Sequence, residues 1–226
     1  AEYADRGVQT LALRQNQGKT AAQNAAARLA TGEVLVFSDA NSMYAPDAVQ
    51  ELVRPLADPR VGCVCGELRY TSAAQNPAGK GEGLYWRYER FLKRRESLLG
   101  SALGANGSIY ALRRPLFVEL DPDIISDFIM PIRIRRAGYR VVYQPAAVAV
   151  EGAGNRFQDE FRRRARIISR SAYGLWTERG VLNPFRHGLF AVQMLSHKVL
   201  RWLVPVHLLV LLATSALLAG MPWFRA

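Results

Sequence analysis

The sequence predicts an α/β fold in which a mostly parallel sheet is flanked by helices and followed by strongly apolar helices. Short apolar runs alternate with segments of helical periodicity, which is typical of α/β proteins. One run, residues 34–37, is apolar at every position, as expected of a strand buried on both faces. The sequence becomes strongly apolar from Leu189 onward, which separates a globular part from a tail.

The individual elements follow from periodicity and from turn and capping residues. Thr20 is expected to cap an alanine-rich helix, and Pro46 and Asp47 to open the next one. The expected strands cover residues 8–13, 34–37, 61–64, 108–112, 139–143 and 148–150. The expected helices cover residues 20–29, 46–56, 82–99, 115–120 and 127–137.

The tail is predicted to associate with a membrane. Residues 181–202 are apolar on one side with basic residues elsewhere, which favours an interfacial helix. Residues 203–220 are nearly all apolar and approach the roughly 20 residues that a membrane-spanning helix needs. A basic segment precedes them and Trp223 follows, as is typical of spans whose preceding domain is cytoplasmic. A buried helix of a larger domain is the alternative, and Pro205 and His207 within the stretch favour it.

The net charge of +11 predicts attraction to an anionic partner. Nucleic acid, an anionic membrane and a pyrophosphate-bearing substrate would all satisfy it. The sequence contains no nucleic-acid-binding motif, and its aromatic residues recur at helical spacing, so no nucleic-acid partner is expected. The densest basic cluster is Arg162, Arg163, Arg164, Arg166 and Arg170, which suits phosphate or a solvated, lipid-facing helix surface equally.

The two cysteines and the chain ends set the context. Cys63 and Cys65 lack metal-site spacing and are poorly placed for a disulfide, so we expect small buried residues in a reducing compartment. The chain begins without methionine or a signal peptide and stops just past the apolar stretch. A fragment lacking both ends is therefore expected.

Three segments carry residues suited to a phosphorylated ligand. Asp39 and Asn41 follow the run 34–37, where the carboxyl end of a strand would deliver oxygen ligands for a divalent cation. Lys19 precedes a helix whose free backbone N–H groups can meet phosphate. Asp127 begins a helix near cations, where a carboxylate stays ionised and can serve as a general base. Taken singly, Asp39 with Asn41 and Asp127 are more typical of turns and helix caps, and Lys19 is as typical of a solvated turn.

In their joint order and spacing these segments resemble the inverting glycosyltransferase family 2, the relatives of cellulose, hyaluronan and chitin synthases. The resemblance rests on Asn16-Gln17-Gly18-Lys19 with Asn24-Ala25-Ala26, on Val36-Phe37-Ser38-Asp39-Ala40-Asn41, on Gly104-Ala105-Asn106-Gly107-Ser108 with Arg113-Arg114, and on Ser126-Asp127 with Arg133 and Gly138-Tyr139-Arg140. It covers nearly the whole chain and implies a GT-A, Rossmann-like fold.

The resemblance implies a role for each matching residue. Asp127 would be the catalytic base, and Asp39 would hold Mg²⁺ or Mn²⁺. The donor diphosphate would be bound by Lys19, Asp39, Asn41, Arg163 and Arg166, and the acceptor by Asn106 and Gly107. The expected partners are a UDP-linked nucleotide-sugar, a saccharide or lipid acceptor, and the cytoplasmic face of the cell (inner) membrane.

Departures from the family pattern limit what the resemblance implies. Asn41 stands where the family has a second aspartate, and Ser126 where it has glutamate. Residues 161–166 keep cations but lack the tryptophan of the processive synthases, which argues against processive polymerisation and leaves the choice between processive and single transfer open. A catalytically degenerate membrane scaffold is the alternative. Residues 1–180 are expected to form a partial catalytic domain, inactive alone because its first strands would precede Ala1.

Overall fold

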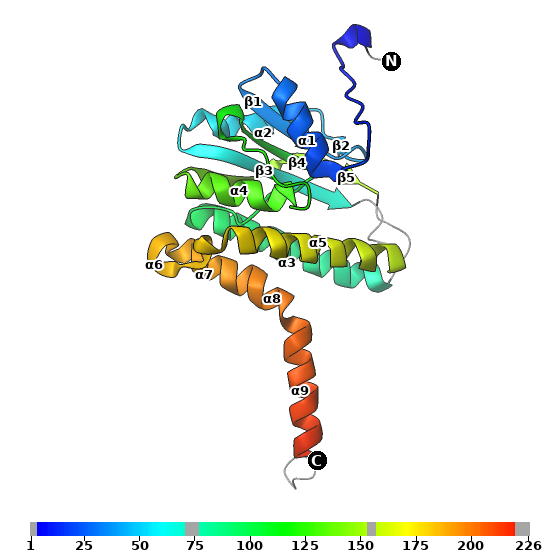
Figure 1. Ribbon diagram of the computed structural model, residues 1–226, viewed down its shortest axis with the longest axis vertical. Coiled ribbons are helices and arrows are strands. Elements are labelled where there is room, and N and C mark those ends of the chain that lie inside the picture. Colours follow the sequence, from blue (N-terminus) through cyan, green and yellow to red (C-terminus); the bar gives the residue numbers. More distant parts are fainter. Residues whose placement is uncertain (1–3, 71–76, 153–156, 220–226) are drawn as a thin grey trace. The chain divides into compact units, whose positions relative to one another are not determined.

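The structure, a computed structural model, describes residues 4–70, 77–152 and 157–219 (Figure 1). The chain divides into two compact units, Ala1–Arg179 and Gly180–Ala226. The division lies close to the expected end of the catalytic part at residue 180. The first unit contains the β-sheet with its helices, and the second is helical.

A mixed five-stranded sheet forms the centre of the first unit (Figure 1). Its strands, in spatial order, are β1 (Val34–Ser38), β4 (Ile109–Arg113), β3 (Val61–Tyr70), β5 (Arg140–Glu151) and β2 (Met43–Tyr44). Only β3 and β5 pair in parallel, and the other three pairs are antiparallel. The expectation of a mostly parallel sheet is therefore wrong, because β4 inserts between β1 and β3 and runs against both.

Within the described residues, β1 is an edge strand rather than a central one. Leu35 and Phe37 are buried, whereas Val36 between them is 40% exposed. Phe37 packs inward by stacking on Tyr110 of β4, with 4.6 Å between ring centroids. A continuous apolar run therefore does not mean burial on both faces here, since one β1 face is largely open.

The expected strands at 139–143 and 148–150 are one strand, β5, interrupted by a bulge. Gly66 of β3 is opposite Gln144, but the next residue, Glu67, is opposite Val148. Pro145 lies in the extra stretch, and proline has no N–H to contribute to a ladder. A Cβ on Gly66 would lie 2.6 Å from the Ala147 carbonyl oxygen, so the bulge requires glycine at that position.

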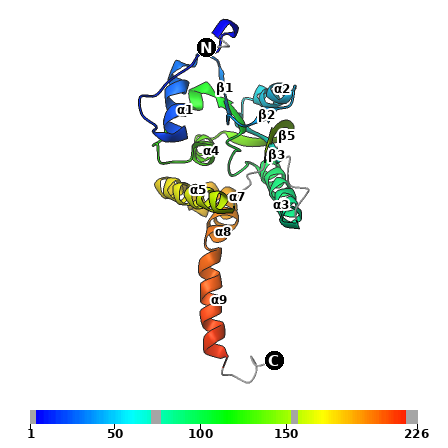
Figure 2. The same ribbon diagram turned by 90° about the vertical axis from the view of Figure 1, so that its right-hand side faces the viewer.

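The helices of the first unit cover both faces of the sheet. Its α-helices are α1 (Gly18–Leu29), α2 (Ala48–Val53), α3 (Pro77–Leu99), α4 (Ser126–Arg136) and α5 (Phe157–Thr177), and its 3₁₀ turns are Ala4–Arg6, Arg54–Ala57 and Arg114–Leu116. Helix α2 packs Ala48 and Leu52 onto one face, and α4 packs onto the other (Figure 2). Cys63 and Cys65 of β3 are fully buried, as expected.

Two of the expected elements differ in the structure. Residues 8–13 form no strand, and Val8, Leu11 and Leu13 are exposed, because no other described segment pairs with them. The expected helix at 115–120 is reduced to the 3₁₀ turn Arg114–Leu116.

The second unit consists of short helices followed by one longer helix. They are the 3₁₀ turn Arg179–Leu182, which begins at the last residue of the first unit, α6 (Pro184–His187), α7 (Leu189–Gln193), a π-helical turn (Met194–Val199), α8 (Leu200–Trp202) and α9 (Val204–Leu218). In the described part of the chain, no single helix has both the length and the apolar character to cross a membrane. Leu189–Trp202 and Val204–Leu218, bent by 59° relative to each other, meet those criteria only as a pair.

Candidate active site

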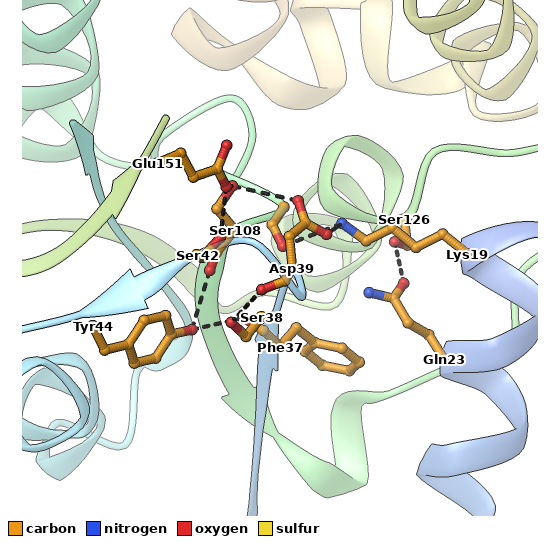
Figure 3. Close-up of polar contacts among 11 residues, drawn as sticks. Lys19, Gln23, Phe37, Ser38, Asp39, Ser42, Tyr44, Ser108, Ser126 and Glu151 are labelled. Carbon is orange, nitrogen blue, oxygen red and sulfur yellow. Dashed lines mark hydrogen bonds and ion pairs between the residues drawn. The ribbon is translucent and has the colours of Figure 1, made fainter. Parts of the chain in front are cut away.

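Asp39 lies immediately after β1, at the carboxyl end of the strand as expected. Its carboxylate forms an ion pair with Lys19 and accepts a hydrogen bond from Ser108 Oγ at 3.4 Å (Figure 3). Asn41 is exposed two residues further along the same turn. The turn thus presents one carboxylate and one carboxamide at this edge of the sheet.

Lys19 is placed by a glycine turn at the start of α1. Gly18 has a φ of +86°, a conformation that favours glycine, and its N–H donates to Asn16 Oδ1 at 3.0 Å. Besides its ion pair with Asp39, Lys19 Nζ donates a hydrogen bond to the Gly107 carbonyl oxygen at 3.2 Å. Lys19 therefore connects the Asp39 turn to residues 104–108, which we call the 104–108 loop.

Polar side chains of α1 fix this helix to the segment that leads into α4. Thr20 was expected to cap this helix, but it does not. Its Oγ1 instead donates a hydrogen bond to the Ile124 carbonyl oxygen at 2.6 Å. Asn24 Nδ2 donates to the Leu120 carbonyl oxygen at 2.7 Å. Gln23 and Ser126 are also hydrogen-bonded to each other (Figure 3). These contacts hold Lys19 in position relative to the start of α4.

Asp127 is the second residue of α4, as expected, and contacts the 104–108 loop through its backbone and its side chain. Its carbonyl oxygen accepts a hydrogen bond from the Ala105 N–H at 2.8 Å. Pro131, four residues further along α4, has no N–H to occupy that carbonyl. The proline therefore leaves the Asp127 carbonyl available to the loop.

Gly107 approaches the Asp127 side chain so closely that a Cβ at this position would force a neighbouring group to move. Its backbone N–H is hydrogen-bonded to the carboxylate. A Cβ at this position would lie 2.5 Å from Asp127 Oδ2 and 2.8 Å from Lys19 Nζ. The expected acceptor-side glycine is thus in contact with both the candidate base and the candidate phosphate-binding lysine.

Burial, rather than nearby cations, has the largest effect on the Asp127 carboxyl and raises its pKa above the ordinary value. Lys19, the next largest influence, lowers this pKa, whereas Asp39 raises it further. Lys93 and the Gly107 N–H also lower it. From the sequence, only nearby cations were expected to act on this carboxyl. A partly buried carboxylate with a raised pKa is a stronger base once ionised, which suits proton abstraction.

The Asn106 side chain is bonded at both ends within the chain. Its Nδ2 donates to the Gly66 carbonyl oxygen at 2.6 Å, and its Oδ1 accepts a hydrogen bond from Lys93 of α3. Asn106, expected to bind acceptor, therefore holds the 104–108 loop against β3. Lys93 was missed in the sequence, where it is one of several basic residues on a helix surface.

A buried glutamate behind Asp39 was also missed. Glu151, the last residue of β5, accepts hydrogen bonds from Ser42 Oγ and Ser108 Oγ, each at 2.5 Å (Figure 3). Because Ser108 also contacts Asp39, this network fixes the turn that carries the candidate metal ligand. A lone acidic residue ending an apolar run was the available signal.

The arginines expected to bind diphosphate are exposed on α5. Arg163 and Arg166 are not among the charges that act on Asp127. Arg170, one to two turns further along, donates to Asp123 at 3.2 Å, and its Nη1 would lie 3.9 Å from a Cβ on Gly18. The structure therefore brings Arg170 to the Lys19 turn.

The residues fit a metal ion only if substrate supplies most of its ligands. Within the described ranges, no group of three or more His, Cys, Asp or Glu side chains could hold a metal. Magnesium is commonly bound through one or two carboxylates together with substrate phosphates and water. Asp39 can supply such a carboxylate when it separates from Lys19.

The fold is that of the GT-A class. The chain belongs to glycosyl transferase family 2, because residues 1–120 of its 226 match that family. It is similar to an N-acetylglucosaminyltransferase of Mesorhizobium japonicum, with 26% identity over 86% of this chain and 46% of the relative. A second N-acetylglucosaminyltransferase, from Rhizobium meliloti, is 25% identical over 94% of this chain and 53% of its own length.

Among solved structures, the chain is similar to a mannosyltransferase of Pyrobaculum calidifontis in complex with GDP-Man and Mn²⁺. The TM-score is 0.67 with 24% identity, covering 99% of this chain and 67% of that one. This similarity supports the GT-A fold that the sequence resemblance implied. The chain spans about half the length of the curated relatives named above.

Proposed function

We propose that the protein transfers a sugar from a UDP-linked nucleotide-sugar to a hydroxyl of a saccharide or lipid acceptor, with inversion at the anomeric carbon. The supporting observation is that Lys19 contacts both the Asp39 turn and the 104–108 loop beside Asp127. The residues proposed to bind the diphosphate and to act as base thus share one edge of the sheet. The names of the relatives make UDP-N-acetylglucosamine the first donor to test.

The proposed reaction is a single displacement. The Asp127 carboxylate accepts the proton of the acceptor hydroxyl, and that oxygen forms a bond to the anomeric carbon. The bond from this carbon to the diphosphate oxygen breaks, and the nucleoside diphosphate leaves with the electron pair. The raised pKa of Asp127 strengthens it as a proton acceptor.

Positive charge near Asp39 stabilises the departing diphosphate. A divalent metal, when bound, neutralises negative charge on the diphosphate as a Lewis acid. Lys19 gains a phosphate partner as it releases Asp39, and Arg170 adds a cation on the same side. We assign this charge to Lys19 and Arg170 in preference to Arg163 and Arg166, because Arg170 is the residue near the Lys19 turn.

We further propose that the second unit attaches the protein to the cytoplasmic face of the inner membrane. Large apolar side chains of α9 are exposed, for example Leu209 at 66%, Leu212 at 68% and Leu217 at 82%. Exposed apolar area of this extent favours a lipid or protein environment over water. Membrane fractionation and vesicle flotation of the full-length protein test this proposal. Recovery in the soluble fraction without vesicle binding contradicts it.

Release of nucleoside diphosphate by the full-length protein tests the reaction. We expect release with one nucleotide-sugar in a panel, dependent on Mg²⁺ or Mn²⁺ and abolished by chelator. Asp39→Asn should reduce release by roughly 10²-fold. Asp47→Asn is the matched control, because Asp47 is an exposed aspartate at the start of α2. No release with any donor contradicts the proposal and favours a non-catalytic scaffold.

A further inference from the structure

Two aromatic side chains meet at the edge of the sheet that carries the candidate site. Tyr70, the last residue of β3, packs against Trp86 of α3 with 5.1 Å between ring centroids and 46° between ring planes. Both side chains are partly exposed. Tyr70 is opposite Glu151 in the β3–β5 register, and Glu151 is hydrogen-bonded to Ser108 beside Asp39. The aromatic pair is thus connected to the Asp39 turn.

Trp86 begins a line of side chains along one face of α3. Arg90 and Lys93 follow it at spacings of four and seven residues, which places the three on the same side of a helix. Arg90 is held by the buried Glu67, whose Oε1 accepts its hydrogen bond at 3.0 Å. At 1.5 Å rise per residue, the line is roughly 10 Å long.

The line ends beside the candidate base. Lys93 donates a hydrogen bond to Asn106, the residue next to Gly107, which contacts the Asp127 carboxylate. The positive charge of Lys93 is also close enough to lower the pKa of Asp127. One helix face therefore runs from the aromatic pair to the group proposed to accept the acceptor proton.

We propose that this face of α3, together with Tyr70, binds a saccharide acceptor of more than one sugar unit. The electron-rich faces of Tyr70 and Trp86 suit the C–H face of a sugar ring. Arg90 and Lys93 donate hydrogen bonds to ring hydroxyls, and Lys93 positions the reacting sugar beside Asp127. This inference rests on the proposed function, since it assigns the acceptor of the same reaction. The aromatic pair favours a saccharide over an acceptor that binds through phosphate alone.

The test compares two variants of the same helix in the full-length protein. With the N-acetylglucosamine tetramer as acceptor and UDP-N-acetylglucosamine as donor, Trp86→Ala should raise the KM for the tetramer about tenfold. Its KM for donor and its acceptor-independent donor hydrolysis should not change. Tyr88→Ala, which removes an exposed aromatic side chain from another face of α3, should leave all of these values unchanged. An unchanged tetramer KM in Trp86→Ala overturns the inference.

Calorimetric binding of the tetramer in the presence of UDP separates this inference from the proposed reaction. We expect wild-type protein to bind the tetramer and Trp86→Ala to bind it about tenfold more weakly. Tyr70→Ala is the second variant, in case Trp86→Ala fails to fold. Binding without nucleoside diphosphate release contradicts the reaction and supports the saccharide site. Release without tetramer binding, or a response only to a polyprenyl phosphate acceptor, overturns the saccharide site and leaves the reaction standing.

Discussion

Lys19 and Asp39 form an ion pair that joins the first turn of α1 to the carboxyl end of β1. The same ammonium group donates a hydrogen bond to Gly107, whose N–H contacts Asp127. One cation therefore lies between the candidate metal ligand and the candidate base. A substitution at Lys19 should therefore affect both the candidate metal ligand and the candidate base.

Replacing Lys19 should affect donor use and the pH dependence of transfer. Lys19→Met removes a cation assigned to the diphosphate, so kcat/KM for donor should fall by roughly 10²-fold. Because Lys19 lowers the pKa of Asp127, its loss should raise that pKa further. The base acts when deprotonated, so the acid limb of the kcat/KM profile should move to higher pH. A pH–rate profile of residual transfer measures this, and an unmoved limb would contradict the pairing of Lys19 with the base.

Enlarging Gly107 should displace the base. The added Cβ of Gly107→Ala would lie 2.5 Å from Asp127 Oδ2, so the carboxylate or the loop must move. We expect transfer to fall by roughly 10²-fold, because small displacements of reacting groups have effects of that size. Gly180→Ala is the control, since a Cβ there meets nothing within 4 Å. Full activity in Gly107→Ala would show that the 104–108 loop is not tightly apposed to Asp127.

Neutralising Asp127 should stabilise the fold at neutral pH. Its folded-state pKa is raised, mainly by burial, so ionisation costs more in the folded than in the unfolded protein. Below the unfolded-state pKa of about 4, the carboxyl is protonated in both states and this difference vanishes. As pH rises through the folded-state pKa, wild type loses stability relative to Asp127→Asn. Thermal unfolding at several pH values measures the trend. A lower Tm for the variant at pH 7.5 would show that the helix N-terminus and the Gly107 N–H outweigh burial.

Glu178, the residue that follows α5, should contribute to stability by joining this segment to α4. Its side chain, 6% exposed, accepts a hydrogen bond from Arg133 Nε at 2.8 Å and pairs with Arg136. Glu178→Gln should lower the free energy of unfolding by about 1–3 kcal/mol, because it leaves two arginines without a carboxylate partner. Urea unfolding measures the loss. Glu119→Gln, at an exposed pair with Arg28, is the matched control and should show no resolvable change.

The sequence correctly predicted that Asp39 follows a strand and that Asp127 lies at a helix start, because these positions depend on local pattern. Asp39 follows a short apolar run that forms β1, and Asp127 follows the turn that precedes a helix. Strand ends and helix starts are set by neighbouring residues.

The sheet order and the contacts between distant segments were not predictable in the same way. Nothing local in β4 shows that it inserts between β1 and β3, so the mixed sheet was missed. Lys93 and Asn106 are joined through the tertiary placement of α3, which packs against β5, and sequence spacing does not specify such a contact. Thr20 was wrongly predicted to be a cap, because capping is predicted from neighbouring residues alone. Its actual partner, the Ile124 carbonyl oxygen, is distant in the sequence.

The most direct test is sugar transfer by full-length Asp127→Asn protein that still binds UDP. If Asp127 is the base, labelled sugar transfer should fall by at least roughly 10³-fold while UDP affinity stays within about twofold of wild type. Asp47→Asn should match wild type in both measurements. Transfer by Asp127→Asn at the wild-type rate would contradict Asp127 as the proton acceptor.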